Sequence, residues 1–105
     1  SGLDSTAADL AKEFPTVEFL PLALDLTKES EVESAIQKTV TKFGRIDYAI
    51  NNAGTGQPLK PTSETDVSDF DKVMAVNLRG VFLCEKHELR QMEKQEPVVP
   101  KDHSW

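Results

Sequence analysis

A short apolar run that ends abruptly in small polar residues constrains the fold of this chain more than any other feature. The run from Tyr48 to Ile50 leads into Asn51-Asn52-Ala53-Gly54, and Val76-Asn77-Leu78 is centred 25 positions after Asn52. An apolar run of this kind is typical of a buried strand, which here delivers a loop of small residues. In open α/β sheets, ligands bind in the loops at the carboxyl ends of the strands. The pattern therefore predicts a parallel-sheet protein with a ligand site after Ile50.

Helical and strand patterns alternate along the rest of the chain. Apolar residues recur at helical spacing in residues 3–14, 32–43 and 67–95, and apolar runs of strand length occupy residues 17–24 and 46–50. Because Pro21 cannot donate a hydrogen bond to a ladder, the first strand is expected at the edge of a sheet. The order helix, strand, helix, strand, helix implies parallel strands joined by helical crossovers, and hence an α/β fold.

Capping residues predict where the first two helices begin and end. Asp4 or Ser5 is the candidate N-cap of the first helix, and Pro15 ends that helix. Thr27 is the expected N-cap of the second helix, and Gly44 stands where a C-cap glycine belongs.

Composition excludes several classes of protein. The 105 residues are 38% hydrophobic and 29% charged, which is ordinary for a globular domain. The net charge of −6 argues against a nucleic-acid-binding face, because such a face needs a basic patch. No apolar stretch approaches the roughly 18 residues that a membrane-spanning helix needs. The single cysteine, Cys84, cannot form an internal disulfide, which favours a reducing compartment and predicts a cytoplasmic protein.

The residues around Asn52 and Asn77, with their spacing, resemble the short-chain dehydrogenase/reductase family of nicotinamide-dependent oxidoreductases over about residues 5–92. The resemblance implies an α/β fold of the three-layer Rossmann type, with a parallel sheet that binds NAD or NADP. Residues 1–105 are then a partial NAD(P)-binding domain, from the third strand to the helix after the fourth, with an irregular tail at 96–105. In this fold the first and second strands lie between the third and fourth, so both strands of this chain are expected to lack neighbours.

Two parts of the family's catalytic machinery are not found in this sequence. Tyr48 is the only tyrosine, and Asn52 stands four positions later, where the family's Tyr-x-x-x-Lys has its lysine. Gly54 and Gly56 are followed by Leu59 where the fingerprint GxGxxG needs a third glycine. The chain therefore looks like the middle of an enzyme, and Tyr48 is expected to be a core residue of a strand.

The resemblance assigns cofactor contacts to two loops. Asp25 matches the aspartate that accepts a hydrogen bond from the adenine amino group, and the backbone of Leu26 is implied to contact the ring. Asn52 is implied to fix the central sheet and line the cofactor ribose, with Ala53 and Gly54 beside the dinucleotide. Two alternatives remain from the residues alone: Asp25 interacts with the dipole of the helix that follows it, and Asn-Asn-Ala-Gly is an ordinary turn.

Asn77 is the catalytic candidate. It falls within an apolar stripe at helical spacing, where an unpaired buried amide costs about 1–3 kcal/mol. The stripe consists of Phe70, Val73, Met74, Leu78, Val81 and Phe82. The resemblance implies that Asn77 lies at a helix kink, holds a water through its main-chain carbonyl and extends a proton relay as the fourth member of a Ser-Tyr-Lys-Asn set. The alternative is a hydrogen-bonded packing residue, with Gly80 allowing a close approach.

No metal site is expected. Cys84, His87 and Glu88 lack the spacing of metal ligands, and one helical turn cannot supply a zinc site. His87 is expected to be a solvated helix residue.

Two main hypotheses for function follow. In the first, the chain is a segment of an NAD(P)-dependent oxidoreductase that interconverts an alcohol and a carbonyl, with a nicotinamide dinucleotide and a small substrate as partners, and is inactive in isolation. In the second, it is a truncated, catalytically silent product that associates with other subunits, since helix 67–95 matches a subunit-interface helix of the family. A weaker third is a relative with the same strand order but other chemistry, such as a sugar epimerase. A homo-oligomer through helix 67–95 is expected in the parent enzyme.

Overall fold

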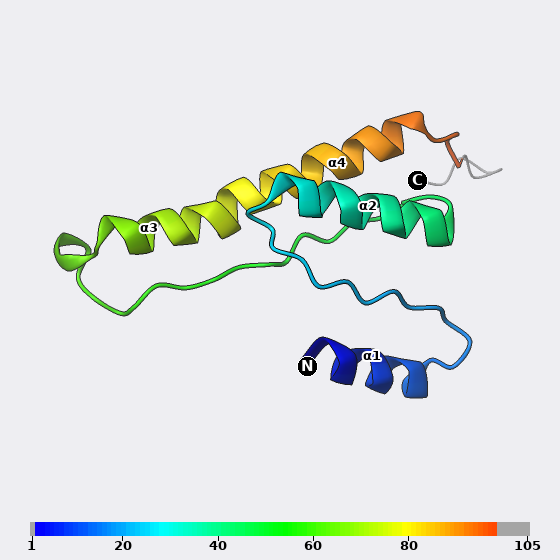
Figure 1. The fold of residues 1–105 in the computed structure, drawn as a ribbon, viewed down its shortest axis with the longest axis horizontal. Helices are drawn as coiled ribbons and strands as arrows, with labels where there is room; N and C mark the ends of the chain where they lie inside the picture. The colour runs from blue at the N-terminus through cyan, green and yellow to red at the C-terminus, as the bar shows by residue number, and fades with distance from the viewer. Residues whose placement is uncertain (1, 99–105) are drawn as a thin grey trace.

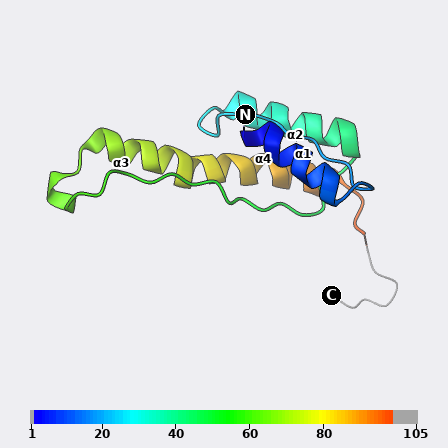
Figure 2. The same ribbon diagram turned by 90° about the horizontal axis from the view of Figure 1, so that it is seen from below.

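Helices joined by long extended segments make up the structure, a computed structural model that describes residues 2–98 (Figure 1). The elements are α1 (Gly2–Glu13), α2 (Glu29–Phe43), the short 3₁₀ turn η1 (Thr62–Glu64), α3 (Val67–Met74), the π-helix η2 (Ala75–Gly80) and α4 (Val81–Lys94). The last three follow one another without a break and form one long rod (Figures 1 and 2). The predicted helix from about Val67 to Gln95 is therefore confirmed, with a π-helical turn at its centre.

The first helix starts earlier than its predicted caps. Helix α1 begins at Gly2, so that Asp4 and Ser5 lie inside its first turns and neither is an N-cap. The Thr6 hydroxyl donates to the Gly2 carbonyl at 2.9 Å, within this extra turn. At the other end, α1 stops at Glu13, two residues before Pro15, as predicted.

The second helix has the predicted end but a different beginning. Gly44 adopts a left-handed conformation with φ of 86°, and its N–H donates to Val40 O at 2.7 Å. Only a residue that tolerates positive φ can close the helix in this way. The predicted N-cap Thr27 is wrong, because Lys28 occupies that position and no side chain caps the helix. The hydroxyl of Thr27 is instead bonded to the carboxylate of Asp25.

The two predicted strands are extended segments without a ladder. Among residues 2–98 no β-strand is formed, and residues 17–24 and 46–50 run as single chains. A strand needs backbone hydrogen bonds to a neighbour, and the described residues hold no strand that could sit between these two. The predicted incomplete sheet is therefore not confirmed by the described residues. Figure 1 shows residues 14–28 running between α1 on one side and α2 on the other, the order of a layered α/β fold.

A small core joins α2 to α4. Val32 and Leu83 are buried at 1% and 4% exposure, and Ile46 closes the core at one end. His87, expected to be solvated, is in fact buried between the helices at 7% exposure. Tyr48, expected in the core, is 82% exposed, since its segment has no neighbouring strand among residues 2–98.

Most of the remaining apolar surface stays in contact with solvent. The chain exposes 8253 Å², whereas a compact monomer of its mass exposes about 5900 Å². Helix α1 packs against no other helix in the part of the chain that the structure describes. The predicted tail has no regular structure from Glu96 to Val98, and its remainder, 99–105, lies outside the described residues.

Candidate functional site

The π-helix η2 is the element around which the candidate site is built. It lies at the junction of α3 and α4, where the helix changes from an α-helical to a wider hydrogen-bond pattern. Such turns are uncommon and occur often at functional sites. Asn77 and Arg79 lie on η2, and Gly80 ends it. These three residues contact the two loops that the sequence predicted to bind the cofactor.

Asn77 holds the loop after the second extended segment. Its Oδ1 accepts from Thr55 N at 2.7 Å, and its Nδ2 donates to Thr55 O at 2.9 Å. The oxygen and the nitrogen of the side-chain amide are therefore both hydrogen-bonded to the backbone of one loop residue. Gly54 lies beside this pair, because a Cβ built on it would be 3.6 Å from Asn77 Oδ1.

The prediction that Asn77 lies on a buried face is wrong, since the residue is exposed. Its hydrogen bonds are made to a loop and not to a packed helix. The apolar stripe around it is also partly exposed, with Leu78 at 65% and Phe82 at 59%.

Arg79 and Gly80 hold the loop after the first extended segment. Arg79 Nη1 donates to Thr27 O at 2.6 Å. Gly80 is buried, and a Cβ there would be only 3.2 Å from Leu26 Cβ and 3.3 Å from Ala75 O. The missing side chain of Gly80 thus allows Leu26 to lie against η2, which is the close approach anticipated for this glycine.

Asp25 is oriented by the residue two positions later. Its Oδ1 accepts from Thr27 N at 2.9 Å and from the Thr27 hydroxyl at 2.6 Å. These bonds, led by that of the hydroxyl, lower the pKa of Asp25 below its ordinary value because they stabilise the carboxylate form. Within the described residues its second oxygen, Oδ2, makes no hydrogen bond and can accept one from a ligand. Both interpretations of Asp25, a contact to the adenine and an interaction with the dipole of α2, are compatible with this orientation.

Within the described residues Asp25 has no hydrogen bond to η2, and neither do two other predicted site residues, Asn52 and Ala53. Both are fully part of the exposed stretch that covers residues 47–64. The neighbouring Asn51 is anchored instead, since its Nδ2 donates to Glu88 Oε1 on α4 at 2.9 Å. The structure therefore brings together Leu26, Gly54 and Asn77 through η2, with Asn52 and Ala53 on the connecting loop.

Sequence reasoning missed Thr55, Thr27 as the partner of Asp25, and Arg79. Thr55 acts through its backbone, so its residue type carried no information. Arg79 could have been noticed as a cation that directly follows the apolar stripe residue Leu78.

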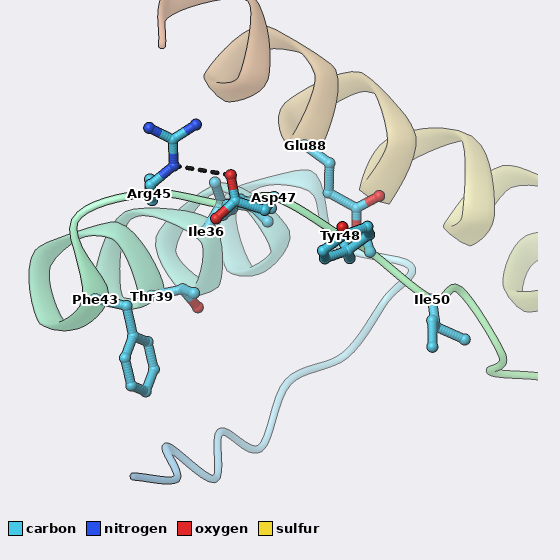
Figure 3. Close-up of a pocket in the computed structure, with 10 residues that line it drawn as sticks. Ile36, Thr39, Phe43, Arg45, Asp47, Tyr48, Ile50 and Glu88 are labelled. Atoms are coloured by element: carbon cyan, nitrogen blue, oxygen red, sulfur yellow. Dashed lines mark hydrogen bonds and ion pairs between the residues drawn. The ribbon is translucent and has the colours of Figure 1, made fainter. Parts of the chain in front are cut away.

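A hollow of about 450 Å³ lies along the second extended segment (Figure 3). It is formed between α2 and residues 45–50, and Phe43 on α2 and Ile50 on the segment lie along its side. Ile50 is 91% exposed. Arg45 and Asp47 pair at 2.8 Å on its rim. The hollow is the open side of a segment that has no neighbouring strand within residues 2–98, and none of Asn52, Ala53 and Gly54 lines it.

Residues 2–98 contain neither a cluster of metal ligands nor a helix that could span a membrane. No three His, Cys, Asp or Glu side chains gather there in a way that could hold a metal ion. None of the helices in that range has both the length and the apolar character needed to cross a bilayer.

Comparison with known sequences gives a family match over nearly the whole chain. A sequence profile described as short chain dehydrogenase matches residues 1–98. Levodione reductase of Leifsonia aquatica is 38% identical over 94 residues, which cover 90% of this chain and 35% of that protein. The chain therefore spans about a third of the length of this relative.

Solved structures of similar proteins superimpose well on this chain. The crystal structure of levodione reductase gives a TM-score of 0.86 over 90% of this chain and 36% of its own. NAD⁺-bound xylitol dehydrogenase gives 0.83 at 31% identity, over 89% of this chain and 35% of its own. An alcohol dehydrogenase from Thermococcus sibiricus, complexed with 5-hydroxy-NADP, gives 0.78 at 32% identity, over 88% and 38%. These likenesses identify the fold class as α/β of the Rossmann type.

Proposed function

Because this chain belongs to the short chain dehydrogenase family, we propose that it is the central segment of an NAD(P)-dependent oxidoreductase that interconverts an alcohol and a carbonyl by hydride transfer. Residues 1–105 are then a partial NAD(P)-binding domain, which begins before the third strand of the parent sheet and ends after the helix that follows the fourth. Its cytoplasmic location stays a prediction from the sequence.

The observation that carries this proposal is the convergence of two predicted site loops on the π-helical turn that holds Asn77. Gly80 packs against Leu26, Arg79 binds the carbonyl of Thr27, and Asn77 binds the backbone of Thr55 beside Gly54. The two loops follow the two extended segments, so they lie where the carboxyl ends of parallel strands present a ligand site.

The residues present fit a dinucleotide. Asp25 offers Oδ2, a carboxylate oxygen without a partner in the described residues, to a donor such as the adenine amino group. Ala53 and Gly54 have small side chains or none, so a ligand can approach the backbone of their loop closely. When bound, the nicotinamide ring supplies the acceptor or donor of a hydride.

Three residues of the chain have defined roles in this proposal. Asp25 accepts a hydrogen bond and orients the ligand, and Asn52 lines its ribose. Asn77 fixes the Gly54–Thr55 loop and, through its backbone in η2, contributes to a proton relay whose other members lie outside this sequence. The general acid and base of the reaction are not among residues 1–105, so we expect no turnover by this chain alone.

A second candidate function is supported by the outer face of the long rod. Met74, Leu78 and Phe82 line an apolar hollow of about 510 Å³ there. Exposed apolar patches of this kind mark contact surfaces. In this alternative the chain is catalytically silent and only associates with other subunits; in the parent enzyme the same face serves a homo-oligomer.

The first experiment is to purify the endogenous protein that carries this sequence and to measure its intact mass and its NAD(P)-dependent activity. A mass more than twice 11.7 kDa together with alcohol oxidation, followed by the absorbance of the reduced cofactor, supports the enzyme. A mass near 11.7 kDa without activity supports the silent subunit. Turnover by the purified 105-residue chain contradicts the proposal that the general acid and base of the reaction are not among these residues.

The same enzyme provides a test of the cofactor loop. Asp25→Asn replaces one oxygen with an NH₂ group and is expected to weaken NAD(P) binding about tenfold, because the side chain then presents a donor to a donor. Asp47→Asn, which changes an exposed aspartate of the second extended segment outside the proposed site, is the matched control. Equal affinities of the two variants for the cofactor exclude the role assigned to Asp25.

A further inference from the structure

A second side-chain amide of the long rod binds backbone in the same way as Asn77. Gln95, the residue that ends α4, accepts from Ile46 N through Oε1 at 2.7 Å and donates through Nε2 to Ile46 O at 2.8 Å. Gln91, one turn earlier, donates to the same Oε1 at 3.2 Å and so fixes the orientation of the amide. Gln95 thus takes the two hydrogen-bonding positions that a neighbouring strand offers.

The two amides hold opposite ends of one extended segment. Gln95 binds Ile46 where the segment begins, and Asn77 binds Thr55 in the loop where it ends. Between them, Asn51 reaches Glu88 at 2.9 Å. The segment therefore runs antiparallel to α4 and η2, beside the rod in both views (Figures 1 and 2).

The lengths of rod and segment agree. Residues 77 to 95 span about 27 Å at the helical rise of about 1.5 Å per residue. Residues 46 to 55 span about 30 Å when fully extended, at about 3.3 Å per residue. A chain held at both ends over a distance close to its full reach has little freedom to shift along the rod. A change in register at Ile46 is then transmitted to Thr55.

We propose that Gln95 is a positioning residue for the Asn52–Thr55 loop. The rod acts as a rigid spacer: Gln95 sets the register of the segment at its start, and this places Gly54 and Thr55 against Asn77 at the other end. The positional claim stands on the hydrogen bonds and lengths alone, whereas its consequence for cofactor binding rests on the function proposed above.

A merely structural role for Gln95 makes a different prediction. If Gln95 only stabilises the packing of α2 on α4, its removal loosens the whole unit, including the amides near Val32 and Leu83. If it sets register, its removal affects Ile46 and the distant Thr55 while the helical amides keep their protection.

The test is amide hydrogen exchange of the ¹⁵N-labelled 105-residue chain, measured by NMR for the unsubstituted protein, Gln95→Ala and Asn77→Ala. Gln95→Ala is expected to speed exchange of both the Ile46 and the Thr55 amides about tenfold, with Val32 and Leu83 changed less than about twofold. In a double variant that carries both Gln95→Ala and Asn77→Ala, the Thr55 amide is expected to exchange no faster than in Asn77→Ala alone. Both substitutions act on one segment, so their effects should not add. Gln37→Ala, which removes an exposed amide from α2, is the matched control and is expected to change neither amide.

Three results overturn the proposal: a Thr55 amide that is unprotected in the unsubstituted chain, a Thr55 rate unchanged in Gln95→Ala, or an equal rise at the helical amides. None of these measurements involves a cofactor. A chain that fails to bind NAD(P) but shows the expected exchange pattern therefore contradicts the proposed function and leaves the role of Gln95 intact.

Discussion

Single residues of η2 set the distance between the two loops of the candidate site. Gly80 is the clearest case, because the atoms nearest to a Cβ position there belong to Leu26 and to the carbonyl of Ala75. A glycine inside a helix ordinarily destabilises it by about 0.5–1 kcal/mol relative to alanine. An alanine at position 80 would favour the helix, but its Cβ would press against Leu26. Packing, and not backbone conformation, therefore explains why a glycine stands here.

Replacement of Gly80 by valine is therefore expected to destabilise the chain by about 1–3 kcal/mol, since the added methyl groups force Leu26 away from η2. The measurement is urea unfolding followed by circular dichroism. Gly56→Val is the control, because nothing lies within 4 Å of a Cβ at Gly56. Equal shifts of the unfolding midpoint in both variants would show that η2 and Leu26 are not in close contact.

At the scale of elements, α2 and α4 form the unit that keeps the site residues in place. Besides the buried apolar side chains of Val32 and Leu83, an ion pair joins the two helices. Lys86 Nζ donates to Glu29 Oε2 at 2.9 Å, and the buried His87 Nε2 lies 3.4 Å from the same oxygen. Within the described residues His87 Nε2 has no hydrogen bond, so the pair of Glu29 with Lys86 is the defined interaction.

This pair predicts a pH dependence of stability. The hydrogen bond from Lys86 lowers the pKa of Glu29 in the folded chain below its ordinary value of 4.5. The folded state therefore binds that proton less readily than the unfolded state. The stabilisation by the pair is complete above about pH 4.5 and is lost as the pH falls below that value toward the lowered pKa.

The check is the urea midpoint of the chain and of Glu29→Gln at pH 7 and pH 3. The difference between the two proteins is expected to shrink on acidification, because the unsubstituted carboxylate is then protonated. Glu33→Gln, an exposed carboxylate on the same helix, is the control. A difference that stays constant between the two pH values would exclude the pair as a source of stability.

At the scale of the whole molecule, residues 2–98 form an open assembly in which the extended segments have no neighbouring strand. Tyr48 and Ile50 stand at 82% and 91% exposure on a segment whose sequence is typical of a buried strand. Such a segment is suited to a sheet in which other strands lie beside it, as the Rossmann fold of the family provides.

We expect thermolysin to cut the isolated chain first within residues 14–28 and 45–61, where the backbone is extended and unpaired, and later within α2 and α4. Mass spectrometry of the early fragments identifies the sites. In the full-length protein, both segments are expected to resist cleavage, because neighbouring strands satisfy their backbone groups. Equal resistance of these segments and the helices in the isolated chain would show that the strands pair without the rest of the sheet.

The sequence by itself determined the features that depend on local spacing. Helical periodicity placed α2 and the long rod, Gly44 ended α2 as predicted, and the Asn-Asn-Ala-Gly and Asn77 motifs pointed to the family that the comparisons then identified. These properties follow from residues within a few turns of one another, or from a motif that needs no coordinates.

Only the tertiary structure decided which polar groups form hydrogen bonds with one another and which side chains are buried. In the structure the Thr27 hydroxyl donates to Asp25, and Asn77 is hydrogen-bonded to Thr55. His87 is buried and Asn77 is exposed, the reverse of what was predicted for each. Sequence periodicity describes one element at a time, whereas a hydrogen bond between positions 22 apart depends on how two elements lie in space. For the same reason the strands stayed unpaired: a strand sequence supplies the propensity, but the ladder needs a neighbour.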